Sequence, residues 1–464
     1  MDRQDVFDRL FVLSCAGVAA VTVFPPAWFW TETLPGTSRW LTPIAIVLTL
    51  AVFPGRRAER HGAALEAALA RVRIKLAPLC RSRSARLAAA CGVFLLIEEA
   101  LFGFRSEFVH GDSINVMRFV DQGDWFHKRA PLSIAAMQAL HSTLGAALDW
   151  SAEQSVQRAS ALAGACAAFA AAHLARTIGG PCLSLQLGVF AATLSTSASL
   201  LFFGYIEHYG VSSAAALWAL ALGVRAIDRE TSPRAPALCA TLAALIHGAM
   251  ATLAVPALFI VGRYAWLRRP DTTSQARWTE ALVTIGLCML LTAIVIALMN
   301  TVGYRLAHET GFGGSDRRMF VPWTDLGGYT RYTLFSTPHF HALLNQWLLT
   351  LPAALTGLPL FGVLWLRERR GSPGTPTQSA VVIYTLLCGT GYLALTAIWN
   401  PDLGPLPDWD LFAPPGLLAS AALATLVVCT HATRPGLATR TLLLITGVNL
   451  SRAIPWIAVN CFMA

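Results

Sequence analysis

The sequence predicts an all-α polytopic membrane protein with about 12 or 13 transmembrane helical segments. Composition is the first reason, because 55% of the residues are hydrophobic, only 13% are charged, and the mean hydropathy is +0.54. A water-soluble domain carries roughly 25% charged residues. The second reason is the recurrence of apolar runs near the roughly 20 residues that a helix needs to cross a bilayer. The third is that lysine and arginine gather in short segments between these runs.

The expected spans follow one another along the chain. They lie at residues 10–30, 40–54, 87–104, 157–176, 183–204, 210–226, 279–300, 342–366, 379–398, 411–430 and 440–462. The first follows MDRQDVFDRL and lacks both a short apolar core and a small-residue cleavage site. We therefore expect it to be retained as a span rather than removed as a signal peptide.

Residues 235–262 form an apolar stretch that is somewhat long for one span. His247-Gly248 and Pro256 lie within it, and basic residues flank both ends. Glycine and proline interrupt helices. We expect two short helices that form a hairpin, with one long span as the alternative.

Lysine and arginine indicate the orientation, since short loops rich in them stay on the cytoplasmic side of a membrane. With a hairpin at 235–262, all the basic loops fall on the same side as the N-terminus, which we expect to be cytoplasmic. These loops are residues 55–86, the turn near Arg176, and residues 225–234, 263–269, 367–370 and 434–440. The net charge of +9 is therefore mostly a topology signal and argues against nucleic acid as a partner.

We divide the chain after residue 86. Residues 1–86 hold an N-terminal transmembrane hairpin and a basic cytoplasmic segment, and residues 87–464 form one transmembrane module. The module has external loops at 105–156, 205–209, 301–341 and 399–410. In the first loop, apolar residues from Pro131 to Leu144 recur at helical spacing, which predicts an interfacial helix along the membrane surface.

Glu207 and His208 lie in LFFGYIEHYG, a turn so short that both must sit at the membrane boundary. Titratable groups are costly there without a reason. They either cap and pair across a helix turn or line a substrate cavity.

The loop at 301–341 places Arg317 and Arg318 among several glycines. Arginine offers a planar fork of donors that keeps its charge. The loop therefore either closes over a phosphate-bearing ligand or is a flexible, solvated segment.

Three carboxylates, Asp402, Asp408 and Asp410, lie in WNPDLGPLPDWDLFAPPG between two apolar runs. The prolines restrict the backbone of this segment. In one interpretation, Asp408 caps the span at 411–430 and Asp410 pairs with an arginine of the 301–341 loop. In the other, Asp408 and Asp410 form the wall of a binding cavity.

Charged residues also occur inside expected spans. Glu98 and Glu99 lie in the run at 87–104, and Arg452 lies well inside the last span. Such groups normally pair or mark a pathway. Arg452 either pairs with one of these glutamates or binds an anionic lipid head group.

The sequence contains no recognisable metal-binding motif. The ten cysteines lie in apolar spans or at their cytoplasmic side, without CxxC or HExxH, so we interpret them as small core residues. Asp121 and Asp124 form a wide acidic pair that suits a divalent ion in an oxygen-only site. We expect no cofactor.

Five motifs resemble bacterial membrane proteins of the GT-C glycosyltransferase superfamily, which includes protein O-mannosyltransferases and aminoarabinose transferases. They are GDS at 111–113, FFGYIEHYG at 202–210, STPHFHALLN at 336–345, NPDLGPLPDWDLF at 400–412 and SRAIPWIAVN at 451–460. An acidic external loop after an early span, followed by an interfacial helix, also resembles that superfamily. An extra N-terminal hairpin precedes the matching region, and the large C-terminal external domain of several relatives does not follow it.

The resemblance implies transfer of a sugar from a polyprenyl-phosphate-linked donor to an acceptor hydroxyl on a lipid, glycan or protein, with inversion. It implies the bacterial cytoplasmic (inner) membrane, with the active side on the periplasmic face. Asp112 matches the superfamily aspartate that acts as, or orients, the catalytic base, although an aspartate there also suits helix capping or pairing with arginine. The implied substrate-binding residues are Glu207, His208, Arg317, Arg318, His339, Asn345, Asp408, Asp410 and Arg452.

A secondary transporter or lipid flippase is the alternative function. Intramembrane Glu98, Glu99 and Arg452 and the expected break near His247 also suit a transport path. Against this, the halves show no evident inverted repeat, and the polar residues gather toward one face instead of the midplane.

Overall fold

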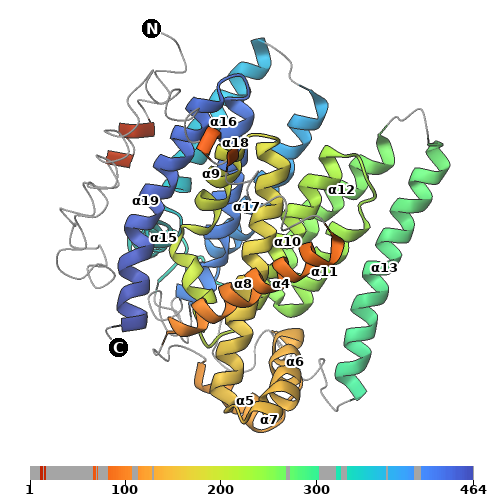
Figure 1. The fold of residues 1–464 in the computed structure, drawn as a ribbon, viewed down its shortest axis with the longest axis vertical. Helices are drawn as coiled ribbons and strands as arrows, with labels where there is room; N and C mark the ends of the chain where they lie inside the picture. Colours follow the sequence, from red (N-terminus) through yellow and green to blue (C-terminus); the bar gives the residue numbers. More distant parts are fainter. Residues whose placement is uncertain are drawn as a thin grey trace.

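The computed structural model confirms the all-helical, polytopic fold class (Figure 1). It describes residues 11–13, 15–16, 66–68, 70–71, 82–106, 113–127, 130–267, 272–301, 320–324, 332–371, 375–401 and 409–462. Within these ranges the regular structure is helical, and one isolated antiparallel bridge joins Phe320 to Trp399.

The helical elements follow the chain in the order shown by the colours of Figure 1. They are α4 (Arg83–Gly103), α5 (Ser113–Asp121), α6 (Pro131–Leu140), η4 (His141–Gly145), α7 (Ala146–Leu148), α8 (Ala152–Gly179), α9 (Leu183–Leu194), η5 (Ser197–Phe202), α10 (Tyr209–Asp228), α11 (Arg234–Ile246), η6 (Gly248–Leu253), α12 (Ala254–Trp266), α13 (Ser274–Thr301), α15 (Thr337–Thr350), α16 (Pro352–Gly371), α17 (Pro376–Thr396), η7 (Trp409–Phe412), α18 (Pro414–Thr430) and α19 (Pro435–Phe462).

Seven helices in the described ranges are long and apolar enough to cross a membrane, and the bent pair α15 and α16 makes an eighth if it is one span. The seven are α8, α10, η6 with α12, α13, α17, η7 with α18, and α19. This number is lower than the 12 or 13 segments expected. The predicted spans at 10–30 and 40–54 lie wholly or almost wholly outside the described residues.

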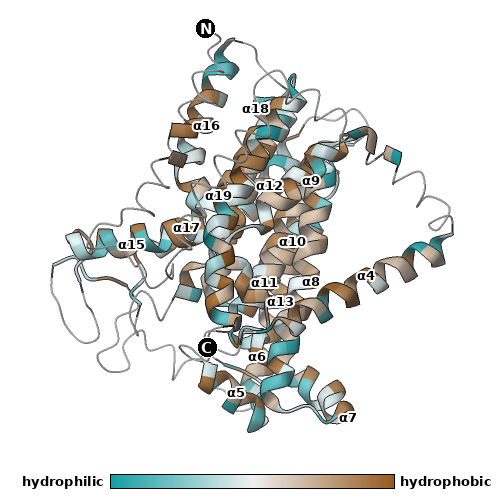
Figure 2. Ribbon diagram, turned by 60° about the vertical axis from the view of Figure 1, so that its left-hand side comes forward, coloured by the Kyte–Doolittle hydropathy of each residue, from teal (hydrophilic) through white to brown (hydrophobic). Residues whose placement is uncertain are grey.

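Breaks within apolar runs explain much of the remaining difference. The run predicted as one span at 183–204 divides into α9 and η5, because Thr196 is extended between them. The run at 342–366 bends by 93° between α15 and α16. Pro352 begins the second helix, and proline disfavours helical backbone in the residue before it. The run at 87–104 forms α4, which carries Glu98 and Glu99. It packs on α8, is oblique to the long helices in Figure 1 and extends away from the bundle in Figure 2.

Residues 235–262 form two helices, α11 and α12, as expected. The chain breaks at His247, whose φ of −150° and ψ of 126° are extended. The short helix η6 follows, and α12 then packs against α11. His247 therefore lies between two helices, as the last residue of the α11 boundary and the first of the η6 boundary.

Helix α18 lies at the centre of the bundle. Its apolar window is wholly buried, and α9, α10, α16, α17 and α19 pack around it. Helix α13 lies at the edge (Figure 1), and only 17% of its window is buried. Its exposed apolar side chains, such as Leu282 and Met289, suit contact with lipid because lipid tails are as apolar as leucine.

Gly416 allows α18 to approach α15 closely. A Cβ atom added at Gly416 would lie 2.4 Å from the carbonyl oxygen of Thr350. Overpacking of this kind costs roughly 1–3 kcal/mol, so we expect Gly416→Ala to lower the midpoint of thermal unfolding in detergent. Gly362→Ala is the matched control, because nothing lies within 4 Å of a Cβ atom there. Equal losses in the two variants would contradict this explanation.

Helices α5, α6 and α7 lie together at one end of the bundle (Figure 1). Val116 and Val120 of α5 and Ile134 and Met137 of α6 form a buried cluster with Ile206 from the turn before α10. A helix therefore does form in the first of the loops predicted to be external, starting at Pro131 as expected. Figure 2 shows hydrophobic residues along the long bundle helices and hydrophilic residues on α5, α6 and the ends of the bundle.

Candidate functional site

Six of the predicted site residues lie in the described part of the chain, and all six are buried. They are Glu207, His208, His339, Asn345, Asp410 and Arg452. Asp112, Arg317, Arg318 and Asp408 lie outside the described residues.

The turn before α10 is held by hydrogen bonds from two other elements. The Ser106 backbone N–H, just after α4, donates to the Phe203 carbonyl at 2.7 Å. The Ser160 hydroxyl of α8 donates to the Tyr205 carbonyl at 2.6 Å. The position of this turn is thus fixed by α4 and α8.

Gly204 gives this turn its shape. Its φ of +61° lies in the left-handed region that favours glycine, and a Cβ atom there would lie 2.6 Å from the Cβ of Arg105. The tight turn directs Glu207 and His208 to the end of the bundle where α5 and α6 lie.

Three histidines from separate segments meet at this end. His127 follows α5, His208 precedes α10, and His247 lies at the break after α11. The His127 and His208 rings are stacked, with centroids 5.6 Å apart and planes 7° apart, and the His208 and His247 centroids are 6.4 Å apart. The carboxylate of Glu207 accepts the His208 backbone N–H at 3.3 Å. We call His127, Glu207, His208 and His247 the histidine cluster.

The cluster favours neutral imidazole at its centre. The Nδ1 of His247 accepts the Ala249 backbone N–H at 3.3 Å, so a neutral His247 carries its proton on Nε2. Burial, together with the charges that His127 and His247 carry when protonated, holds the pKa of His208 well below its usual value. The buried Nδ1 of His208 has no hydrogen-bond partner in the described part of the chain. His208 can thus offer a hydrogen bond to a polar ligand.

Acid is expected to destabilise the protein through His208. A histidine whose pKa is lower in the folded state contributes stability that is complete above the unfolded pKa of about 6.5 and is lost as the pH falls. The titratable neighbours that contact or influence the ring are His127, Glu207 and His247. We expect the thermal midpoint to fall below about pH 6.5, and to fall less in His208→Gln. The same pH dependence in both proteins would refute this assignment.

The geometry does not favour a metal ion at the cluster. Lone pairs of imidazole nitrogens lie in the ring plane, so the stacked rings of His127 and His208 cannot both direct them at one ion. Among the described residues, no group of three or more His, Cys, Asp or Glu could hold a metal. Asp121 and Asp124, the acidic pair considered for a divalent ion, are both exposed at the end of α5.

Trp409 links the turn before α10 to the last helix. Its Nε1 donates to the Tyr205 hydroxyl at 3.1 Å, and the two rings pack edge to face with centroids 5.4 Å apart. On its other side Trp409 packs edge to face against Trp456 of α19, also at 5.4 Å. Residues from three distant parts of the chain therefore form one aromatic wall.

Asp410 is buried next to this wall. Its Oδ1 accepts the Leu411 backbone N–H at 2.8 Å, and the Tyr392 hydroxyl donates to the Leu411 carbonyl at 3.0 Å. The arginines of the 301–341 loop, with which Asp410 is expected to pair, lie outside the described residues. Both roles predicted for Asp410 therefore stay predictions.

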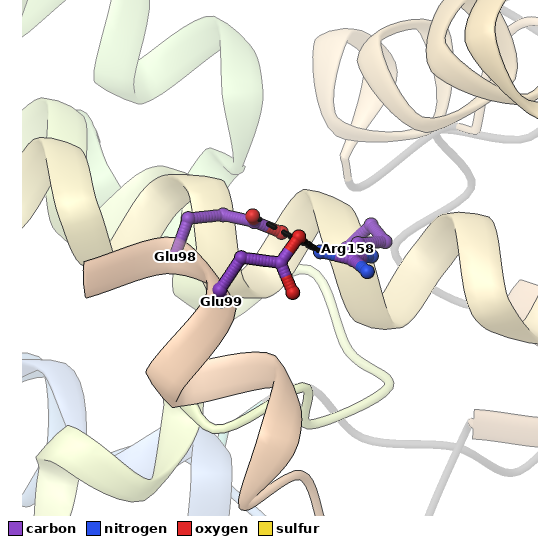
Figure 3. Close-up of polar contacts among 3 residues, drawn as sticks. All are labelled: Glu98, Glu99 and Arg158. Carbon is purple, nitrogen blue, oxygen red and sulfur yellow. Dashed lines mark hydrogen bonds and ion pairs between the residues drawn. The ribbon is translucent and has the colours of Figure 1, made fainter. Parts of the chain in front are cut away.

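Glu98 and Glu99 pair with Arg158 of α8, not with Arg452 (Figure 3). One nitrogen of Arg158 lies 2.8 and 3.0 Å from the two carboxylate oxygens of Glu98 and 2.7 Å from an oxygen of Glu99. The expectation that Arg452 is a partner of one of these glutamates is wrong, because α4 packs directly on α8.

Arg452 is only 1% exposed. It lies on α19 one turn before Trp456, whose ring contacts Trp409. Arg452 therefore lies one helical turn along α19 from the residue that α19 contributes to the aromatic wall. Its role toward an anionic head group stays a prediction.

His339 and Asn345 lie on α15, which projects from the bundle in Figure 2. The ring of His339 stacks on Tyr332 at 4.9 Å, and its Nδ1 bonds to the Leu334 carbonyl at 2.6 Å. The Asn345 side chain donates to the His341 carbonyl at 2.9 Å.

Sequence reasoning did not identify Arg158, His127 and His247 as site residues. Arg158 lies near the start of an expected span, on the side predicted to be outer, where basic residues are not expected from the topology. His127 belongs to the acidic first loop, and His247 marks the break in an apolar run. Each signal is visible locally, but nothing local indicates that the three lie near the ends of neighbouring helices.

Comparison with known proteins gives structural similarity at low sequence identity. No protein-family model and no curated protein matches the sequence. ArnT from Cupriavidus metallidurans bound to undecaprenyl phosphate is 12% identical, with a TM-score of 0.44 over 82% of this chain and 78% of that chain. The apo state of the same ArnT is 10% identical, with a TM-score of 0.47 over 82% and 77%.

The oligosaccharyltransferase of Archaeoglobus fulgidus, tethered with an acceptor peptide, is 13% identical, with a TM-score of 0.41. The match covers 80% of this chain and 55% of that chain, so the present protein spans little more than half of the oligosaccharyltransferase. Similarity of this degree concerns the general arrangement of helices.

Proposed function

We propose that the protein is an integral-membrane glycosyltransferase that uses a polyprenyl-phosphate-linked sugar as donor. The acceptor is a hydroxyl group on a lipid, glycan or protein at the outer face of a bacterial inner membrane. This proposal rests on the motif resemblance and on the arrangement of polar residues at one end of the bundle. It does not rest on the distant structural similarities.

One observation carries the proposal. The end of the bundle that bears α5 and α6 also bears the histidine cluster and, through Tyr205, the loop of Trp409 and Asp410. Asp112 immediately precedes Ser113, the first residue of α5, so it belongs to the same external segment. Polar groups expected to be external from sequence thus gather where an external active site requires them.

The proposed chemistry is a single displacement. Asp112 takes the proton of the acceptor hydroxyl, which is otherwise a weak nucleophile. The acceptor oxygen bonds to the anomeric carbon as the bond from that carbon to the phosphate oxygen breaks, and the polyprenyl phosphate leaves with the electron pair. Attack opposite the leaving group inverts the anomeric centre.

The remaining residues have proposed roles in binding. Arg317, Arg318 and Arg452 supply fixed positive charge for the phosphate, whose charge grows as it leaves. Neutral His208, together with Glu207 and Asp410, binds hydroxyl groups of the sugar or acceptor. Asp408 binds hydroxyl groups beside Asp410. His339 and Asn345, from α15, contribute further contacts to the substrate.

A direct assay tests the function. Purified protein is incubated with a panel of polyprenyl-phosphate pentoses and hexoses and with membrane-derived acceptors, and products are measured by mass spectrometry. The expected result is an acceptor heavier by one sugar residue, together with free polyprenyl phosphate. Movement of a solute or lipid across sealed proteoliposomes, without any glycosidic product, would favour the transporter alternative and refute the proposal.

A further inference from the structure

A second cluster of charge lies at the opposite end of the bundle from α5 and α6. Helix α8 has 28 residues and runs about 40 Å from Ala152 to Gly179 at 1.5 Å per residue. Its C-terminal turns, the start of α9 and the end of α10 surround a cavity of about 920 Å³. The polar side chains that line it and matter here are His173, Arg176, Gln186, Arg225, Asp228 and Arg229.

The cavity has an excess of positive charge. Three guanidinium groups face it against one carboxylate, that of Asp228. Within the described residues, Arg176, Arg225 and Arg229 form no ion pair, since the ion pairs there are those of Arg158 and Arg234. The residues that line the cavity therefore carry two more positive than negative charges, before the nearby carboxylate of Glu66 is counted.

The imidazole in the wall adds no further charge. A guanidinium nitrogen of Arg225 lies 3.4 Å from Nε2 of His173. Arginine only donates, so this ring nitrogen is the acceptor and His173 is neutral in this contact. The contact holds the Arg225 side chain from α10 against α8, which places the guanidinium group at the cavity.

A carboxylate from the protein itself is bound next to the cavity. The carboxylate of Glu66 accepts the backbone N–H groups of Leu183 and Ser184 at 2.8 Å each, and Leu183 lines the cavity. Glu66 belongs to the segment 55–86 that the sequence marks as basic, and it lies in the described part of that segment. This contact shows that the start of α9 accepts an oxyanion beside the arginines.

We propose that this cavity is a binding site for a phosphate-bearing group, distinct from the sugar-transfer site. Arginine is suited to phosphate because its planar fork donates two hydrogen bonds at fixed geometry. Three arginines against Asp228, with the Glu66 carboxylate bound at the start of α9, leave a net positive charge that suits an anionic phosphate group. The volume falls within the roughly 300–1,000 Å³ of small-molecule sites, which leaves room for a substituent on the phosphate. Gln186 also lines the cavity, and its amide nitrogen donates to the Gly180 carbonyl at 2.6 Å.

The phosphate group has two possible sources at this end of the bundle. The positions of lysine and arginine predict that this end is cytoplasmic. Anionic lipid head groups and soluble phosphate compounds both occur at that surface. The proposal is independent of sugar transfer, and its test measures binding alone.

The test uses the full-length protein in detergent with inorganic pyrophosphate as probe, at constant ionic strength. Titration calorimetry should detect pyrophosphate binding to the wild type. Arg176→Gln, Arg225→Gln and Arg229→Gln should each weaken it about tenfold, since a hydrogen bond to a charged group contributes roughly that factor. Arg225→Lys should retain more binding than Arg225→Gln because it keeps the charge.

Arg370→Gln is the matched control. Arg370 is exposed in the last turn of α16, outside the cavity. The Arg370→Gln protein should bind pyrophosphate like the wild type. This result would show that binding depends on the arginines of the cavity and not on the general positive charge of this surface. Thermal melts confirm that each variant is folded, and Arg229→Gln, just beyond the end of α10, is the variant with the least structural risk.

A second arm distinguishes the two sources. The protein is placed in nanodiscs of phosphatidylcholine with and without phosphatidylglycerol, and pyrophosphate binding is measured again. Loss of pyrophosphate binding in the presence of phosphatidylglycerol identifies a lipid head group, and unchanged binding identifies a soluble ligand. If neither pyrophosphate nor phosphatidylglycerol binds in a manner that depends on the three arginines, the proposal is wrong.

Discussion

Asp112→Asn is expected to reduce sugar transfer by about 10²- to 10⁴-fold, the range that a positioned general base contributes. Asparagine has nearly the same shape but cannot take a proton at neutral pH. If Asp112 instead caps α5, asparagine caps about as well, and activity should persist. The variant therefore separates the catalytic role of Asp112 from the capping role.

Asp149→Asn is the control for this experiment. Asp149 lies in the same segment, 105–156, which is predicted to be external. It is exposed and has a φ of +55°, a conformation that asparagine tolerates well. Transfer should be close to that of the wild type. Expression, membrane insertion and elution from size exclusion are measured for both variants, and a fully active, correctly inserted Asp112→Asn protein rules out the role of base.

Arg158→Met is expected to destabilise the protein by about 3–5 kcal/mol, because removing one partner leaves a buried charge uncompensated. Glu98 is only 4% exposed, and Arg158 is its partner (Figure 3). The guanidinium group also lies 3.7 Å from the centre of the Phe102 ring, so its loss removes a cation–π contact as well. Reversible unfolding in mixed micelles, followed by fluorescence, measures the change.

Two further variants isolate the cause. Glu98→Gln combined with Arg158→Met removes both charges, and it should recover part of the lost stability. Glu99→Gln should cost no more than about 1 kcal/mol, because its side chain is 62% exposed and exposed ion pairs contribute little. A double variant no more stable than Arg158→Met would show that packing, not the unpaired carboxylate, causes the loss.

The sequence predicts the helices well where the signal is local. Composition and the length of the apolar runs indicate an all-helical membrane protein. Proline at position 131 and the spacing that follows predict the start of α6, and His247-Gly248 predicts the break between α11 and α12. The bend at Leu351-Pro352 is visible in sequence as a proline, yet the hydropathy of the surrounding run hides it.

The site is predicted only in part. Glu207, His208 and Asp410 are expected from their positions between spans, and the structure buries all three. The partner of Glu98 is not predicted, because 60 residues separate it from Arg158 and their pairing depends on the packing of α4 against α8.

The amino-acid sequence is enough to predict the helical membrane fold and the positions of most helices, and it indicates which loops are basic. These properties depend on residues that are close in sequence, because the length of an apolar run, the helix-breaking residues and the charged residues can be read from short segments. Which helices are adjacent depends on how the folded chain packs, and this packing assembles the histidine cluster, the aromatic wall and the arginine-lined cavity. Helices within a membrane associate by close packing and hydrogen bonds rather than by hydrophobic burial. No periodic pattern in the sequence records those partners.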